Sequence, residues 1–172
     1  MKIMRSVTTS ASPSPQWTRH LAPLLLAWLL AAAWGSVVQT QWNLQALVGL
    51  GVDIPAAERA RATWQDLIGF APLYAGILAA GWLPALPLAA LLARRWPARR
   101  SVLLAAAAGV GMVVAVRAVD AAAPMPVFID ATRHLPGLLA MALGAVIAGL
   151  LYARLTERDN PGLSEKRTPE ER

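Results

Sequence analysis

The chain contains no cysteine, only two histidines and few charged residues, which make up 15% of its 172 positions. Soluble domains carry roughly 25% charge. The absence of cysteine excludes disulfides, thiolate nucleophiles and cysteine-ligated metal or iron–sulfur sites. With so few reactive groups, the sequence predicts neither a metal site nor a cofactor.

Hydrophobic residues make up 56% of the chain and fall into long blocks. A helix needs about 20 apolar residues to cross a bilayer. We therefore predict an all-α fold, an integral membrane bundle of four transmembrane helices. The predicted spans are residues 21–38, 67–93, 101–119 and 135–153, within a transmembrane domain at 20–155. Residues 1–19 and 156–172 are predicted to be disordered cytoplasmic tails.

The first apolar block has a second interpretation as a cleaved signal peptide. A basic start precedes it, and Ala31, Ala32 and Ala33 offer small residues for cleavage. However, its 18 residues exceed the usual signal core of about 7–15 residues. A retained first span is therefore the favoured prediction.

The segment between the first two spans is predicted to lie on the outer membrane surface. Amides at Gln39, Gln41, Asn43 and Gln45 alternate with other residues, and a period of two indicates an extended segment. After two glycines, the residues Asp-Ile-Pro at 53–55 predict a helix start. The residues that follow predict a short amphipathic helix on the outer surface, with one face formed by Ala56, Ala60, Trp64 and Leu67.

The basic side chains lie at the ends of the apolar blocks and form no basic face. The formal net charge of +6 therefore indicates contact with the lipid bilayer and not with nucleic acid. Twelve of the 16 Lys and Arg residues fall in the two tails and the loop at 94–100, against four in the other loops. Positive charge is retained inside, so both termini and this loop are predicted to be cytoplasmic.

No Asp, Glu, Lys, Arg or His lies in the middle of a predicted span. Ion-coupled transporters often place ionisable groups there, so the pattern disfavours that class. An enzyme would have to use Ser36 at the outer end with His134 and Asp130. The histidines, His20 and His134, are expected about 30 Å apart on opposite faces and cannot share a metal ion.

Two groups of residues are candidates for binding a ligand or partner. The first is charged and lies at the predicted outer end, where it suits an anionic headgroup or a partner's loop: Arg59, Arg61, Asp66, Arg117, Asp120, Asp130, Arg133 and His134. The alternative is local, with Arg117 paired to Asp120 or extended to lipid phosphate. The second group is Trp28 and Trp82, both expected at mid-depth. They either pack between the first two spans, with their N–H groups on carbonyls freed by Pro84 or Pro87, or line a lipid or quinone pocket.

Small residues mark predicted contact faces, because helices associate in lipid by close packing. The predicted contact residues are Gly76, Ala80, Gly109, Ala140, Gly144 and Ala148. The same faces suit one compact bundle, a homo-oligomer or a membrane-protein partner.

Two stretches carry a resemblance to a known group. Residues 39–45, Gln-Thr-Gln-Trp-Asn-Leu-Gln, and residues 66–74, Asp-Leu-Ile-Gly-Phe-Ala-Pro-Leu-Tyr, precede the arginine-rich loop. Over residues 20–155 the chain resembles a family of small uncharacterised four-span proteobacterial inner-membrane proteins. The resemblance implies a bacterial inner-membrane location and carries no activity.

Two hypotheses about function follow from these features. The first is an accessory or assembly subunit or scaffold that acts by association, with residues 39–66 as its recognition surface. The alternative is a protein that binds or transports a lipid or a quinone-like lipophilic ligand.

Overall fold

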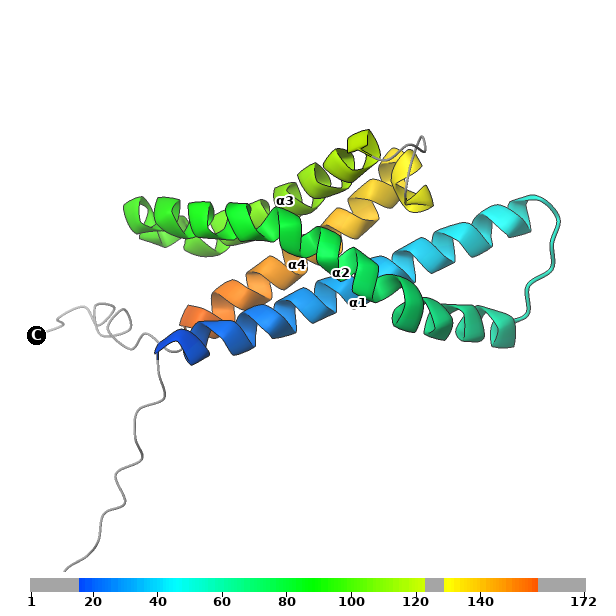
Figure 1. The fold of residues 1–172 in the computed structure, drawn as a ribbon, viewed down its shortest axis with the longest axis horizontal. Coiled ribbons are helices and arrows are strands. Elements are labelled where there is room, and N and C mark those ends of the chain that lie inside the picture. Colours follow the sequence, from blue (N-terminus) through cyan, green and yellow to red (C-terminus); the bar gives the residue numbers. More distant parts are fainter. Residues whose placement is uncertain (1–15, 123–128, 158–172) are drawn as a thin grey trace, which may run out of the picture.

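The structure is a computed structural model that describes residues 16–122 and 129–157. Within these ranges the chain forms four long helices: α1 (Gln16–Gly49), α2 (Ala56–Arg95), α3 (Arg100–Ala122) and α4 (Leu135–Glu157) (Figure 1). Two short 3-10 helices, η1 (Pro97–Arg99) and η2 (Asp130–Arg133), adjoin α3 and α4. The predicted all-α bundle of four helices is confirmed. Most of both predicted tails lies outside the described residues.

The four helices run up and down, and each packs against two neighbours. Helix α1 contacts α2 and α4, and α3 contacts the same two helices from the opposite side of the bundle. The start of α1 and the end of α4 lie at the same end as the turn between α2 and α3 (Figure 1). We call this the basic end, because it carries Arg94, Arg95, Arg99 and Arg100. The opposite end, with the α1–α2 connection, is the hairpin end.

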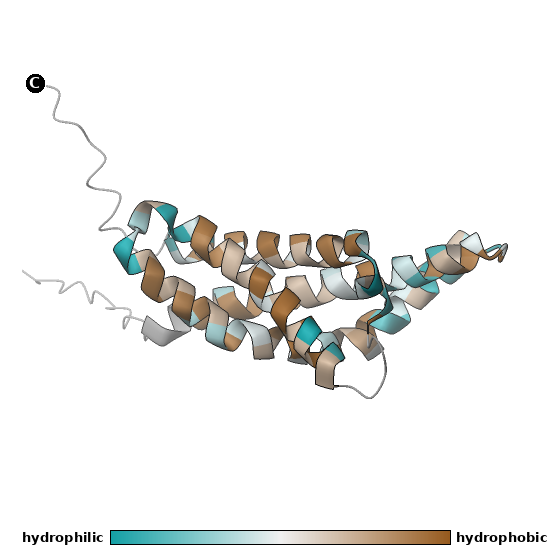
Figure 2. Ribbon diagram, turned by 90° about the horizontal axis from the view of Figure 1, so that it is seen from above, coloured by the Kyte–Doolittle hydropathy of each residue, from teal (hydrophilic) through white to brown (hydrophobic). Residues whose placement is uncertain are grey.

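Helices α1 and α2 are much longer than their partners. At 1.5 Å per residue, the 23 residues of α3 and of α4 each span about 35 Å, close to the ~30 Å hydrocarbon core. The 34 residues of α1 span about 51 Å and the 40 of α2 about 60 Å. The excess projects beyond α3 and α4 as a helical hairpin (Figures 1 and 2), and hydrophilic residues gather on it.

The prediction of an extended segment at residues 39–45 is therefore wrong, since these residues are helical. The alternating amides fit a helix equally well, because residues spaced by two include pairs that are four residues apart, and such pairs lie on the same helix face. Gln39 and Asn43 form such a pair, with a side-chain hydrogen bond of 3.4 Å. The predicted surface helix also differs: it is not a separate element but the first turns of α2, which begins at Ala56 as residues 53–55 predicted.

Helix α1 ends in a hydrogen-bonded glycine turn. The N–H of Gly51 bonds the carbonyl of Val48, and the N–H of Val52 bonds that of Leu47. Gly51 has φ of 87°, which a residue with a Cβ adopts only with strain. This pattern is a Schellman motif, and it terminates α1 at the predicted glycine pair.

Close packing of the bundle depends on glycines at helix crossings. A Cβ on Gly81 would collide with the backbone carbonyl of Gly111, so α2 and α3 are in backbone contact there. A Cβ on Gly144 would collide with the Trp34 ring of α1. The prediction for Gly76 is wrong, because this residue is exposed and a Cβ there would meet nothing within 4 Å.

Each of the four helix interfaces contains one side-chain N–H that donates to a backbone carbonyl of the neighbouring helix. Three donors are indoles, and their acceptors lie 2.8 to 2.9 Å away: Trp28 to Ala75, Trp34 to Ala140 and Trp82 to Ala108. The fourth is the Arg100 guanidinium, which donates to the Ala153 carbonyl of α4 at 2.9 Å. These bonds join α1 to α2, α1 to α4, α2 to α3 and α3 to α4.

Candidate functional site

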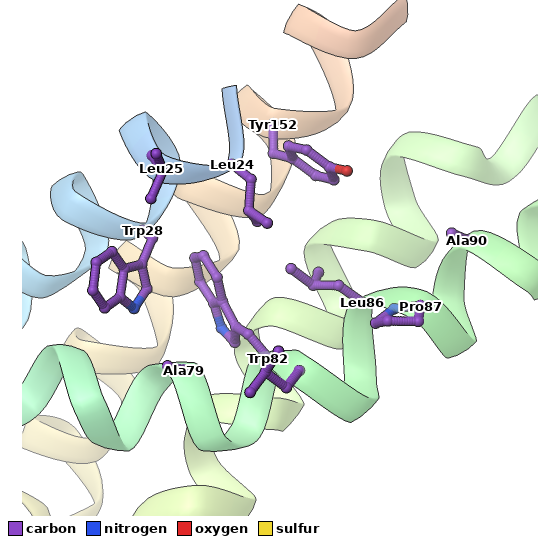
Figure 3. Close-up of a pocket in the computed structure, with 10 residues that line it drawn as sticks. Leu24, Leu25, Trp28, Ala79, Trp82, Leu86, Pro87, Ala90 and Tyr152 are labelled. Carbon is purple, nitrogen blue, oxygen red and sulfur yellow. The ribbon is translucent and has the colours of Figure 1, made fainter. Parts of the chain in front are cut away.

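An apolar pocket of about 370 Å³ opens between α1, α2 and α4 in the half of the bundle nearer the basic end (Figure 3). Its volume falls within the range of about 300–1,000 Å³ that is typical of ligand sites. Two tryptophans, Trp28 and Trp82, form one side of it. The principal lining residues are Leu24, Trp28, Trp82, Leu86, Ala90 and Tyr152.

The indole N–H groups of the pocket are already used within the protein. Trp28 donates to the Ala75 carbonyl and Trp82 to the Ala108 carbonyl, each at 2.9 Å. The predicted acceptors, carbonyls freed by Pro84 or Pro87 four residues earlier, are therefore wrong, because the acceptors are the carbonyls of Ala75 and Ala108. The tryptophans consequently offer a ligand apolar ring surface and no hydrogen bond.

Tyr152 supplies the pocket's available polar group. In Figure 3 its ring extends from α4 beside Leu24, and its hydroxyl points toward the side of Ala90. This hydroxyl has no hydrogen-bond partner among the residues that the structure describes, although the Arg100 charge lies close enough to act on it. The pocket thus combines an apolar interior with one hydroxyl near the basic end.

The projecting hairpin is a second candidate site. At its base, Thr40 donates to the Asp66 carboxylate at 2.7 Å and Gln41 donates to the Thr63 hydroxyl at 2.9 Å. These bonds fix α1 against α2 where they leave the bundle. Toward the tip, Leu50 is 81% exposed, and at the base, next to Thr63, Trp64 is 65% exposed. A hollow runs along α1, lined in part by Val38, Gln41, Trp42, Gln45 and Arg59.

The predicted charged residues form two local pairs. Arg117 lies 3.6 Å from Asp120, as their three-residue spacing predicted, and Arg133 lies 2.9 Å from Asp130. Asp66 accepts from Thr40, Arg59 borders the hollow beside α1, and Arg61 and His134 are exposed. Within residues 16–122 and 129–157, no hydrogen bond or ion pair joins Arg59 or Arg61 to either pair.

Ser36, the nucleophile that an enzyme would need, is fully buried. Its hydroxyl has no hydrogen-bond partner among the described residues, so the structure contains no bond between Ser36 and His134. In the same part of the chain, no three His, Asp or Glu side chains lie close enough together to hold a metal ion.

Several residues that shape these sites were not identified from the sequence. Gln39 accepts a hydrogen bond of 2.8 Å from the Ala131 N–H, which places η2 beside α1 although 92 positions separate the two residues. Arg100 of α3 likewise donates to the Ala153 carbonyl of α4, 53 positions away. Only the four-residue spacing of Gln39 and Asn43 gave a local signal for the helix that positions Gln39.

Comparisons of the chain with family models, curated proteins and solved structures found no match. The class of the protein therefore follows from its own features. Four helices of 23 to 40 residues are long and apolar enough to cross a bilayer. The chain is a multi-pass α-helical membrane protein.

Proposed function

We propose that the protein acts by association, as an accessory or assembly subunit or scaffold whose projecting hairpin docks a protein partner outside the membrane. The observation that carries this proposal is the length of α1 and α2. Helix α1 is 11 residues, or about 16 Å, longer than α3 or α4, and α2 is 17 residues, or about 25 Å, longer. A segment that served only to connect two spans would not need this rigid projection.

The surface of the hairpin supports the same proposal. Leu50 and Trp64 are exposed on a segment that is otherwise rich in polar side chains. Apolar groups that gather outside the hydrocarbon region are commonly covered by a partner. Trp42 and Arg59 border the adjoining hollow, and Trp and Arg are enriched among the residues that dominate binding energy at protein interfaces.

The proposed location is the bacterial inner membrane, with the basic end in the cytoplasm. The distribution of Lys and Arg supports this orientation, because positive charge is retained inside. The resemblance of residues 39–45 and 66–74 to proteobacterial inner-membrane proteins supports the location. The hairpin would then reach into the periplasm.

Site-specific photo-crosslinking in native membranes tests the docking proposal. A photoreactive residue at position 64 should give a discrete protein adduct, and the same probe at Val110 should not, because that exposed α3 residue faces lipid. Leu50→Asp should reduce the adduct several-fold, whereas Val110→Ser should leave it unchanged. Adducts only with lipid, or only with a second copy of this chain, would overturn docking of a separate protein.

A second candidate function is the binding of a lipophilic molecule, and the pocket beside Trp28 and Trp82 favours it. Both tryptophans line this apolar volume of about 370 Å³, which supports the function. Retention of a lipid or quinone through purification in mild detergent, and its loss in Ala90→Trp, would support this function.

A further inference from the structure

On its α2 side, the apolar pocket continues toward the basic end into a helix face with one cation, whereas Arg100, the cation near Tyr152, is already bonded to Ala153 and Thr156 of α4. On α2, the lining residues Leu83, Pro87 and Ala90 follow the spacing of one helix face, and Arg94 is the next position on that face. Arg94 is exposed and has no ion pair or hydrogen bond within the described residues. An unpaired guanidinium therefore lies one helical turn beyond the pocket lining on this face of α2.

The dimensions of this surface match one leaflet of a bilayer. From Trp82 to Ala90 the helix rises about 12 Å, and Arg94 lies about 6 Å further along the axis. Half of the hydrocarbon core is about 15 Å thick. With Arg94 at the headgroup level, the two tryptophans lie near the bilayer midplane and the pocket covers the depth of one acyl chain.

The polar groups are all at one end. The Tyr152 hydroxyl points toward Ala90 (Figure 3) and Arg94 follows one turn later, while the deep part of the pocket offers only apolar groups. A quinone places its oxygens on one ring and needs partners around that ring. An acyl chain with an ester group and a charged headgroup has the polarity gradient that this surface presents.

We propose that the pocket holds an acyl chain of an anionic phospholipid, with an ester oxygen at the Tyr152 hydroxyl and the headgroup phosphate at Arg94. The inference rests on the second candidate function, the binding of a lipophilic molecule in this pocket. It adds the class of ligand and the residue that selects it. Basic side chains beside grooves between transmembrane helices are a known means of holding anionic headgroups.

The test is native mass spectrometry of the delipidated full-length protein, titrated with dioleoyl phosphatidylglycerol or dioleoyl phosphatidylcholine. The two lipids have the same chains and differ in net charge. The wild type should bind phosphatidylglycerol about fivefold more tightly, as expected for one surface cation. Arg94→Gln should remove this preference.

Arg95→Gln is the matched control. It removes the same charge from the neighbouring position, but Arg95 lies about 100° further round the helix, away from the pocket face. It should leave the preference intact. Tyr152→Phe should weaken the binding of both lipids about threefold, the effect of one hydrogen bond, and should keep the preference. Ala90→Trp should abolish binding of both lipids, because it fills the mouth of the pocket from an exposed position.

The outcomes separate this inference from the function on which it rests. If Ala90→Trp abolishes binding but the wild type binds both lipids equally, or Arg94→Gln and Arg95→Gln behave alike, the headgroup assignment is wrong and the lipophilic site remains. If Ala90→Trp binds lipid like the wild type, both the headgroup assignment and the lipophilic site are wrong. Elution volume and helix content should match the wild type for every variant, since Arg94 and Ala90 are exposed and Tyr152→Phe keeps the ring.

Discussion

The lack of a Cβ at glycine determines how closely the helices approach. Gly81 and Gly111 put the backbones of α2 and α3 in contact, whereas Gly76, little more than one turn away on the same helix, faces open space. The two positions on α2 look alike in the sequence, because both are glycines between alanines and large apolar residues. Their difference arises from the crossing partner, which supplies a carbonyl at one position and nothing at the other.

Gly81→Ala should destabilise the protein, because its Cβ would collide with backbone that cannot move aside alone. We expect a loss of about 1–3 kcal/mol in the free energy of unfolding, the range for overpacking. Gly76→Ala adds the same atom without a contact and should be neutral or stabilising by up to about 1 kcal/mol, the helix preference of alanine over glycine. Reversible unfolding in mixed detergent micelles measures the free energy of unfolding of both variants. Equal values for Gly81→Ala and Gly76→Ala would contradict the backbone contact between α2 and α3 at Gly81.

At the scale of elements, donor side chains join the helices in pairs. Three indoles and one guanidinium each reach a backbone carbonyl of the neighbouring helix, so every interface contains a polar bond within a mainly apolar contact. The Arg100 interaction is the most extensive. Its guanidinium also donates to the Thr156 hydroxyl at 2.7 Å and lies 3.8 Å from Glu157, which joins the start of α3 to the last turn of α4.

Arg100→Met should therefore weaken the junction of α3 and α4. We expect a loss of about 1.5–3 kcal/mol in the free energy of unfolding, the range for hydrogen bonds made by a charged group. Arg99→Met removes the same charge from the adjacent position, where the side chain is exposed and has no ion pair among the described residues, and should change stability by less than about 0.5 kcal/mol. The same detergent unfolding assay compares them, and a similar loss in both variants would assign the effect to net charge.

At the scale of the whole molecule, the two ends of the bundle differ in chemistry. One end carries four arginines within seven residues, and the other carries the long hairpin (Figure 2). The proposed lipid site and the proposed docking surface therefore lie at opposite ends. This separation allows each proposal to be tested by variants that leave the other site unchanged.

The absence of native cysteine allows orientation to be tested with single introduced thiols. In intact spheroplasts, the proposed orientation predicts that Leu50→Cys reacts with a membrane-impermeant maleimide, whereas Ala98→Cys, at the basic end, reacts only after permeabilisation. Val110→Cys should stay unlabelled in both conditions, since it lies on the lipid-facing side of α3. Labelling of Ala98→Cys in intact spheroplasts would reverse the proposed orientation.

The sequence by itself determined the class of the protein and the approximate position of its four long helices. Long apolar blocks admit few alternatives to membrane helices, and glycine and proline pairs mark where helices end and begin. These are local properties of the sequence, so they can be recognised without knowledge of the tertiary structure. The same local reasoning failed at residues 39–45, because amides spaced by two are compatible with both a strand and a helix.

Only the tertiary structure decided which groups meet. The partners of the indoles, the bond from Ala131 to Gln39, and the backbone contact of Gly81 with Gly111 all join residues between 26 and 106 positions apart in the chain. The pocket beside Trp28 and Trp82 likewise needs Tyr152 from α4. Such contacts depend on how the helices are rotated and crossed, which is set by the packing of all four helices together and leaves no local pattern in the chain.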